Sequence, residues 1–285
     1  MLDLDHILFP TDFSYNAENA LPFALEVARH TGARLTIFHV IETPAYVPHN
    51  SDDLPKTHSE KARTLLERVA DDVRSSERYG DLEIEAVLQN GNVVTEIEKQ
   101  ADTHNVNLIV MGTKGKTTVD RILYGSIASH IILDTDIPVL AIPENSSRTT
   151  FDPITFATDF REGDWPALKE TLDWVTTFDA QLNVLHVTER HDFDTDIKFR
   201  GFRNFVREHT DRQPIQFDLV VQNQFLTGVA DYLTDHPVGL LVLVRYNKNR
   251  LQSLIKKNHT KEMSYYTKVP LLVLAGREAP FNRED

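Results

Sequence analysis

Three glycines and one serine lie at a spacing that suits the binding of phosphate groups. They are Gly112, Gly115, Gly125 and Ser126, and they follow directly on the apolar run Leu108–Met111. Glycine has no Cβ, so backbone amides beside it can approach phosphate oxygens closely. A helix that begins near Ser126 would add unpaired N–H groups and the positive end of its dipole. The alternative interpretation is that these glycines only form turns.

The segment Gly115-Lys116-Thr117 invites comparison with the P-loop of nucleotide triphosphatases. That motif requires a glycine five residues before the glycine of its Gly-Lys pair. Val110, inside the apolar run, occupies that position here. The P-loop interpretation is therefore excluded.

Asp12 stands at the end of the first apolar run, where a carboxylate could accept hydrogen bonds from an adenine amino group or from ribose hydroxyls. Asp12 and Ser14 are also good N-caps for a helix over residues 14–31, and the two roles are compatible. The pair Thr11-Asp12 returns later in the chain as Thr158-Asp159. This repetition favours a ligand role for Asp12.

Composition excludes several other kinds of chemistry. The chain has no cysteine among its 285 residues, which rules out disulfides, thiolate metal sites and a cysteine nucleophile. Its 12 histidines show no spacing typical of a metal site, and no serine-hydrolase elbow is present. We expect His39 and His186, each at the end of a strand, to be structural.

The net charge of −13 argues against nucleic-acid partners and anionic membranes. No apolar run approaches the length of a membrane helix, and the N-terminus does not resemble a signal peptide. We therefore expect a cytoplasmic protein without nucleic-acid or membrane partners.

The same domain occurs twice in the chain. Four blocks recur in the same order, at a displacement of about 147 residues that falls to about 132 further on. The pairs of blocks are Ile7–Phe13 with Ile154–Phe160, Ala33–Glu42 with Ala180–Glu189, Leu108–Met111 with Leu240–Leu243, and Ile137–Leu140 with Val269–Leu272. The polar stretch between them predicts domains at residues 1–145 and 150–280.

Each repeat alternates strands with helices. In the first repeat the pattern predicts strands at residues 6–10, 35–40, 82–88, 108–111 and 138–142, and helices at 16–31, 57–77, 93–104 and 126–133. Such alternation is typical of right-handed βαβ crossovers. The predicted fold is therefore α/β, with two tandem doubly wound three-layer α/β/α domains. Each domain has a five-stranded parallel sheet.

The spacing Gly-x2-Gly-x9-Gly-Ser resembles the nucleotide signature of the universal stress protein family. The first and last strand sequences resemble that family as well, so the whole chain is similar to a tandem pair of its domains. The resemblance implies ATP, with a divalent cation such as Mg²⁺, in the first domain only. It implies contacts from Pro10, Thr11, Asp12, Val40, Met111, Gly112, Gly115, Lys116, Gly125, Ser126 and Ile127. It also implies pairing through the last strand, which the two domains would satisfy internally; a further homodimer stays open.

The second repeat departs from this signature. Val244 and Asn247 replace the first two glycines, and Lys257 and Asn258 replace the final Gly-Ser pair. We therefore expect no ATP site of the same kind in the second domain.

A basic stretch lies where the second repeat has lost the signature. Residues 245–268 contain seven Lys or Arg residues and one Glu. One interpretation is a solvated surface. The other is a site for an anion or an acidic partner at Arg245, Lys248, Lys256 and Lys257.

The resemblance implies an ATP-binding stress-response or signalling protein that is not an enzyme. One alternative is slow ATP hydrolysis, for which Asp120 is the candidate to position water. The other is a scaffold that binds partners without a ligand.

Overall fold

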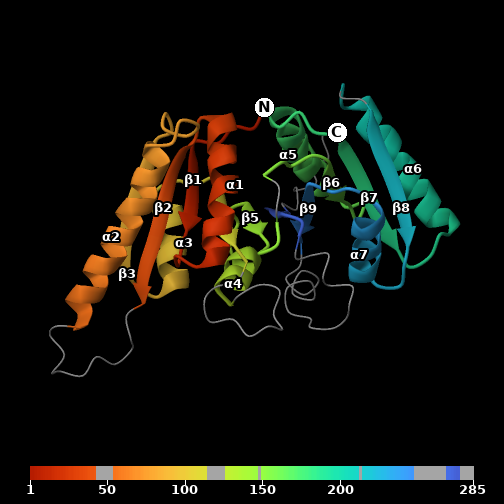
Figure 1. Ribbon diagram of the computed structural model, residues 1–285. Helices are drawn as coiled ribbons and strands as arrows, with labels where there is room; N and C mark the ends of the chain where they lie inside the picture. Colours follow the sequence, from red (N-terminus) through yellow and green to blue (C-terminus); the bar gives the residue numbers. More distant parts are fainter. Residues whose placement is uncertain (43–53, 114–125, 147–148, 212–213, 247–267, 277–285) are drawn as a thin grey trace, which may run out of the picture. The chain divides into compact units, whose positions relative to one another are not determined.

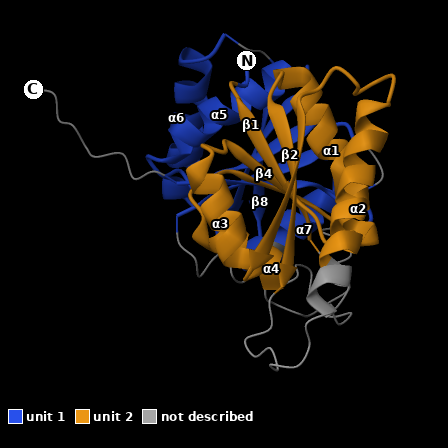
Figure 2. Ribbon diagram, turned by 90° about the vertical axis from the view of Figure 1, so that its left-hand side faces the viewer, with its two compact units in different colours: residues 1–2, 145–285 blue, residues 3–144 orange. Residues whose placement is uncertain are grey.

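The computed structural model describes residues 1–42, 54–113, 126–146, 149–211, 214–246 and 268–276. The chain divides into two compact units, which Figure 2 shows in different colours. The N-terminal unit consists of residues 3–144, and the C-terminal unit of residues 1–2 and 145–285. Each is described by itself.

The N-terminal unit contains five parallel strands in the order β3-β2-β1-β4-β5 (Figure 1). Its elements in chain order are β1 (His6–Pro10), α1 (Tyr15–Thr31), β2 (Arg34–Glu42), α2 (Leu54–Arg74), β3 (Ile84–Gly91), α3 (Val93–Thr103), β4 (Leu108–Gly112), α4 (Ser126–Asp134) and β5 (Val139–Ile142). The chain winds first toward β3 and then back toward β5. Right-handed crossovers therefore place α1 and α2 on one face and α3 and α4 on the other.

The C-terminal unit repeats this order as β8-β7-β6-β9-β10, again with parallel neighbours. Its elements are β6 (Ile154–Ala157), α5 (Asp164–Thr177), β7 (Leu182–Thr188), α6 (Phe193–Glu208), β8 (Ile215–Val221), α7 (Phe225–Asp235), β9 (Leu240–Arg245) and β10 (Leu271–Ala275). The predicted fold class is confirmed: each unit has five parallel strands in a doubly wound order.

The ends of α1 follow from local sequence. Ser14 is the N-cap, and its Oγ accepts a hydrogen bond from the N–H of Ala17 at 3.3 Å. Gly32 ends the helix at φ 75°, a conformation that glycine adopts without steric cost. The helix buries apolar residues such as Phe23 and Val27 against the sheet. These are the ends that the sequence predicted.

Three other elements differ from the prediction by two or more residues. Strand β3 lies at Ile84–Gly91, where residues 82–88 were predicted. Strand β2 runs on to Glu42 because β3 continues to pair with it as far as Gly91. Helix α2 begins at Leu54 and ends at Arg74, about three residues before the predicted limits. Pro55 in its first turn is compatible with this start, because that turn needs no backbone N–H.

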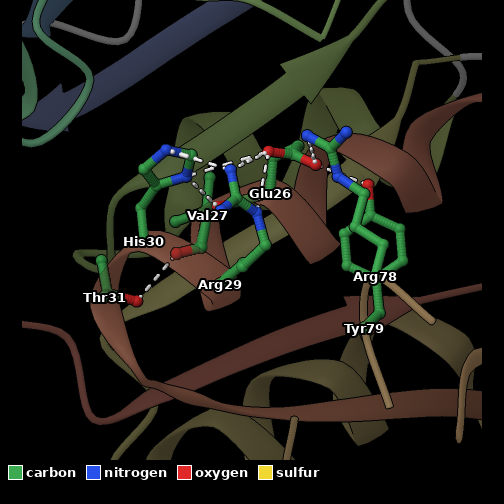
Figure 3. Close-up of polar contacts among 7 residues, drawn as sticks. All are labelled: Glu26, Val27, Arg29, His30, Thr31, Arg78 and Tyr79. Carbon is green, nitrogen blue, oxygen red and sulfur yellow. Dashed lines mark hydrogen bonds and ion pairs between the residues drawn. The ribbon is translucent and has the colours of Figure 1, made fainter. Parts of the chain in front are cut away.

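A buried carboxylate ties α1 to the connection between α2 and β3 (Figure 3). Glu26, with a side chain 5% exposed, accepts hydrogen bonds from Tyr79 Oη at 2.5 Å and from Arg29 at 2.9 Å. Arg78 forms an ion pair with it at 2.7 Å. Burial alone would raise the pKa of Glu26. The hydrogen bonds from Tyr79 and Arg29 and the two guanidinium charges outweigh burial and lower that pKa.

Among the described residues, no helix combines the length and the apolar character needed to cross a bilayer.

Candidate functional site

Those predicted site residues that the structure describes lie where the direction of winding reverses. In the N-terminal unit the chain leaves β1 for β2 on one side and later returns to β4 on the other. Open α/β sheets bind ligands at such a switch point, outside the carboxyl ends of the strands. Asp12 follows β1 and Gly112 ends β4, so the two lie on either side of it.

A tight turn holds the residues after β1. Phe13 has a φ of 56°, which is uncommon for a residue with a Cβ. Two side-chain hydrogen bonds fix the turn: Phe13 N–H donates to Thr11 Oγ1 at 3.1 Å, and Ser14 N–H donates to Asp12 Oδ1 at 3.0 Å. Asp12 is nevertheless exposed, so its carboxylate is held in place and reaches solvent.

The turn explains why the pair Thr-Asp occurs twice. In the C-terminal unit Phe160 has a φ of 57°, and its N–H donates to Thr158 Oγ1 at 3.0 Å. The threonine is therefore a part of the backbone turn in both units. The repetition alone does not require a ligand.

An aromatic pair lies beside this turn. The ring of His39 contacts the ring of Phe13, with centroids 4.5 Å apart, and its Nδ1 lies 2.7 Å from the carbonyl oxygen of Thr11. The C-terminal unit repeats this arrangement. The ring centroids of His186 and Phe160 lie 3.9 Å apart, and His186 Nδ1 lies 2.7 Å from the carbonyl oxygen of Thr158. The expectation that both histidines are structural agrees with these contacts.

Val40 presents its backbone toward the same edge. Thr11 N–H donates to the carbonyl of Phe38 at 2.8 Å, and the ladder between β1 and β2 ends with the pair Pro10 and Phe38. Backbone groups two residues apart in a strand point to the same side. The N–H and C=O of Val40 therefore point past the end of β1, next to Asp12. The side chain of Val40 is buried.

Gly112 permits a close approach that the sequence did not reveal. A Cβ at this position would lie 2.7 Å from the carbonyl oxygen and 2.9 Å from the carbonyl carbon of Asn16, and 3.2 Å from Ala17 N. The first turn of α1 therefore packs directly on the end of β4. Packing within the unit alone is enough to require glycine here.

Three further predicted positions, Met111, Ser126 and Ile127, lie at the two ends of the segment between β4 and α4. Met111 is buried, and Thr113, which was not predicted, continues the edge because its N–H donates to the carbonyl of Ile142 at 3.1 Å. Ser126 is exposed as the first residue of α4, and Ile127 is half-buried. The other predicted residues of this segment, Gly115, Lys116 and Gly125, lie outside the described residues, as does Asp120.

The C-terminal unit fills the corresponding region with side chains. The carboxylate of Asp164, at the start of α5 and 1% exposed, accepts hydrogen bonds from Thr158 Oγ1 at 2.6 Å and from the N–H groups of Asp159 and Arg161 at 2.9 and 3.1 Å. Its other oxygen accepts from Tyr246 Oη at 2.6 Å. Burial raises the pKa of the Tyr246 hydroxyl, and the hydrogen bond to Asp164 raises it further.

Tyr246 also occupies space beside β10. A Cβ on Gly276 would lie 2.4 Å from its ring, and the guanidinium of Arg161 lies 5.0 Å from the ring centroid. In the repeat Tyr246 corresponds to Lys114, next to Gly115, the second glycine of the motif. A bulky ring thus follows β9 where the N-terminal unit has the start of its glycine-rich segment.

A polar cleft of about 520 Å³ opens at the carboxyl ends of β6 and β7. Asp159 and Val187, which line it, correspond to Asp12 and Val40. Arg161 and Arg190 also line it and have no basic counterparts in the first repeat. Of the predicted anion site, Arg245 ends β9, whereas Lys248, Lys256 and Lys257 lie outside the described residues.

Comparisons with known proteins agree with this architecture. The model of the universal stress protein family matches residues 4–143. A protein of Staphylococcus haemolyticus named as a universal stress protein is 30% identical over 164 residues, which span 57% of this chain and 98% of that protein.

Two solved structures resemble the whole chain. A universal stress protein from Archaeoglobus fulgidus has a TM-score of 0.74 at 19% identity, over 98% of this chain and 99% of its own. A Pseudomonas aeruginosa protein described in the same way has a TM-score of 0.61 at 14% identity, over 95% and 93%. These likenesses support the fold alone. The family match and the staphylococcal relative establish the family: this chain belongs to the universal stress protein family.

Proposed function

We propose that the N-terminal unit binds ATP together with Mg²⁺ and that occupancy of this site, not turnover, is the chain's contribution to a stress response or to signalling. The observation that carries the proposal is the meeting of Asp12 and the backbone of Val40 at the switch point of the sheet. The glycine motif follows the neighbouring strand.

The donors and acceptors at this edge fit the base and the sugar of a nucleotide. The N–H and C=O of Val40 point past the end of β1 and match the paired acceptor and donor on the edge of adenine. The carboxylate of Asp12 is exposed and oriented by the N–H of Ser14, so it can accept hydrogen bonds from ribose hydroxyls. Both groups belong to rigid elements, which lowers the entropy lost on binding.

The phosphates are assigned by sequence to Gly115, Lys116, Gly125 and Ser126. Ser126 begins α4, where backbone N–H groups and the helix dipole favour an anion. Residues 1–145 carry 12 basic and 23 acidic side chains, so free ATP meets a repulsive field. Bound Mg²⁺ would neutralise part of the phosphate charge.

The C-terminal unit supports a single ATP site per chain. Val244 stands where Gly112 does in the repeat, and Tyr246 forms a hydrogen bond with Asp164 in place of the glycine-rich segment. Phosphate groups could enter there only if Tyr246 moved away. The buried carboxylate of Asp164 would then lose its hydrogen bond from Tyr246. We therefore expect one equivalent of ATP at saturation.

The duplication supplies a matched test. Calorimetric titration of Mg·ATP should give one site in the wild-type chain, a loss of at least about tenfold in affinity for Asp12→Ala, and wild-type affinity for Asp159→Ala. Mass spectrometry of ligand released by heat from freshly purified protein should detect an adenine nucleotide. Equal losses in both variants, or two equivalent sites, would contradict the assignment.

The two alternative functions, slow ATP hydrolysis and a scaffold that binds no ligand, predict different results. Single-turnover hydrolysis that Asp120→Asn abolishes would establish an ATPase. If the purified protein retains no nucleotide and binds no ATP in calorimetry, the result favours a scaffold that works without a ligand.

A further inference from the structure

Helix α6 carries large apolar side chains on its outer face. Phe193 is 79% exposed, Ile197 is 53% exposed and Phe205 is 39% exposed. These residues and the exposed Gly201 follow one another at intervals of four, so they form one row along the helix. We call this row, Phe193, Ile197, Gly201 and Phe205, the α6 stripe.

The α6 stripe is separate from the face that packs inward. Val206 is fully buried, and the rings of Phe199 and Phe202 lie 6.2 and 5.5 Å from the ring of Phe160. Helix α6 therefore already has an apolar inner face. Within the stripe, the ring of Phe205 also lies 5.0 Å from that of Trp165 on α5. A surface helix normally has a polar outer face, so the core does not account for Phe193 and Ile197.

Packing within the C-terminal unit does not explain Gly201 either. It lies within the 16-residue helix, and a Cβ built on it would meet nothing within 4 Å. Glycine within a helix is less stable than alanine, and no close contact in the described residues compensates. Close approach by the backbone of another molecule would use the missing side chain, and bulky residues stand on both sides of it in the stripe.

We propose that the α6 stripe is the interface for a second copy of this chain, in which two α6 helices pack antiparallel about a twofold axis midway between Ile197 and Gly201. This arrangement places Phe193 opposite the partner's Phe205. It places Ile197 over the partner's Gly201, where the absent Cβ leaves room for it. Rows spaced by four residues interdigitate at a crossing angle of about 50°, which concentrates contact at the centre of the stripe.

Charge along α6 selects the antiparallel direction. Asp194 and Asp196 lie in its first turn, whereas the rest of the helix carries Lys198, Arg200, Arg203 and Arg207 against Glu208. Arg200, in the middle of the helix, pairs with Asp196 at 2.8 Å. An antiparallel pair brings the acidic beginning of one helix beside the basic end of the other. A parallel pair would bring like charges together.

The matching helix of the first repeat provides a control. The side chain of Leu65 on α2 is 45% exposed, a fraction similar to that of Ile197. In the described part of α2 it belongs to no comparable row of exposed large apolar side chains. Substitutions at both positions change solvent-facing side chains, so the fold should survive them. Circular dichroism and thermal unfolding verify this in each variant.

The first experiment is sedimentation equilibrium of the full chain between about 1 and 200 µM, a range suited to micromolar dissociation constants. We expect reversible dimers of the wild type. Ile197→Glu should raise the dissociation constant at least tenfold, and Leu65→Glu should leave it unchanged. Gly201→Ala should raise the unfolding temperature yet weaken the dimer. A monomeric wild type, or equal effects of Ile197→Glu and Leu65→Glu, would overturn the proposal.

The second experiment tests orientation. The chain has no cysteine, so introduced thiols report only on the chosen positions. A mixture of the Ile197→Cys and Gly201→Cys proteins, whose positions face each other at the centre of the stripe, should form a mixed disulfide under mild oxidation. Phe193→Cys alone should not. A disulfide between two Phe193→Cys chains would indicate a parallel pair and refute the antiparallel model. None of these readouts depends on ATP.

Discussion

Replacement of Gly112 by alanine should force β4 and α1 apart. The new methyl group would lie 2.7 Å from the carbonyl oxygen of Asn16 and 2.9 Å from its carbonyl carbon, whereas ordinary contacts begin near 3.4 Å. Both atoms belong to backbone and cannot rotate away, so the first turn of α1 must move by several tenths of an ångström. Overpacking of this kind costs about 1–3 kcal/mol.

The same movement should reach the proposed ATP site. Asn16 and Ala17 are in the turn that Ser14 caps, and the N–H of Ser14 orients the carboxylate of Asp12. We expect Gly112→Ala to lower the affinity for Mg·ATP by about tenfold, or ~1.4 kcal/mol. Calorimetry with Gly239→Ala, a similarly crowded glycine of the C-terminal unit, should show no change.

Two optical probes separate the units during unfolding in urea. The chain has two tryptophans, Trp165 and Trp174, both in the C-terminal unit, so their fluorescence follows that unit. Far-UV circular dichroism follows both units. Gly112→Ala should lower stability in the circular dichroism signal and leave the fluorescence midpoint in place. Gly239→Ala, whose Cβ would lie 2.6 Å from Asp152 N, should lower the fluorescence midpoint. A Gly112→Ala chain within about 0.5 kcal/mol of wild type would refute the packing argument.

Four other substitutions test the described contacts and the motif. Glu26→Gln should destabilise the N-terminal unit by about 1–2 kcal/mol at pH 7, because Arg29 and Arg78 lose their counter-ion but remain partly solvated. The folded-state pKa of Glu26 lies below its ordinary 4.5, so this stability is present above pH 4.5. It is lost as pH falls, and urea titrations at pH 7 and at pH 3 should show the two proteins converging. Gly115→Val or Gly125→Val should abolish ATP binding in calorimetry with little change in unfolding, since a branched side chain blocks the approach to phosphate; unchanged affinity in both would contradict the motif assignment. Tyr246→Phe should cost about 1 kcal/mol in the fluorescence transition, because one hydrogen bond to the buried Asp164 is lost; an unchanged midpoint would argue against that bond.

The sequence by itself determined the fold class, because its signals are local. Apolar runs of strand length and the helical spacing in residues 16–31 are readable without any knowledge of neighbours. Ser14 and Gly32 fix the ends of α1 through hydrogen bonds within a few residues. The duplication is likewise visible in the order of four short blocks. The spacing of the glycine motif is also local, and it resembles that of the universal stress protein family.

Tertiary structure decided what these residues touch. The sequence predicted that Gly112 contacts a phosphate group. The structure shows that the backbone of Asn16, 96 positions earlier in the sequence, leaves no room for a Cβ at Gly112. The hydrogen bond of Tyr246 with Asp164 spans 82 residues, and that of Tyr79 with Glu26 spans 53. Such contacts depend on strand order and on the face to which each crossover returns. Periodicity fixes the elements one at a time, whereas only their packing brings distant side chains within bonding distance.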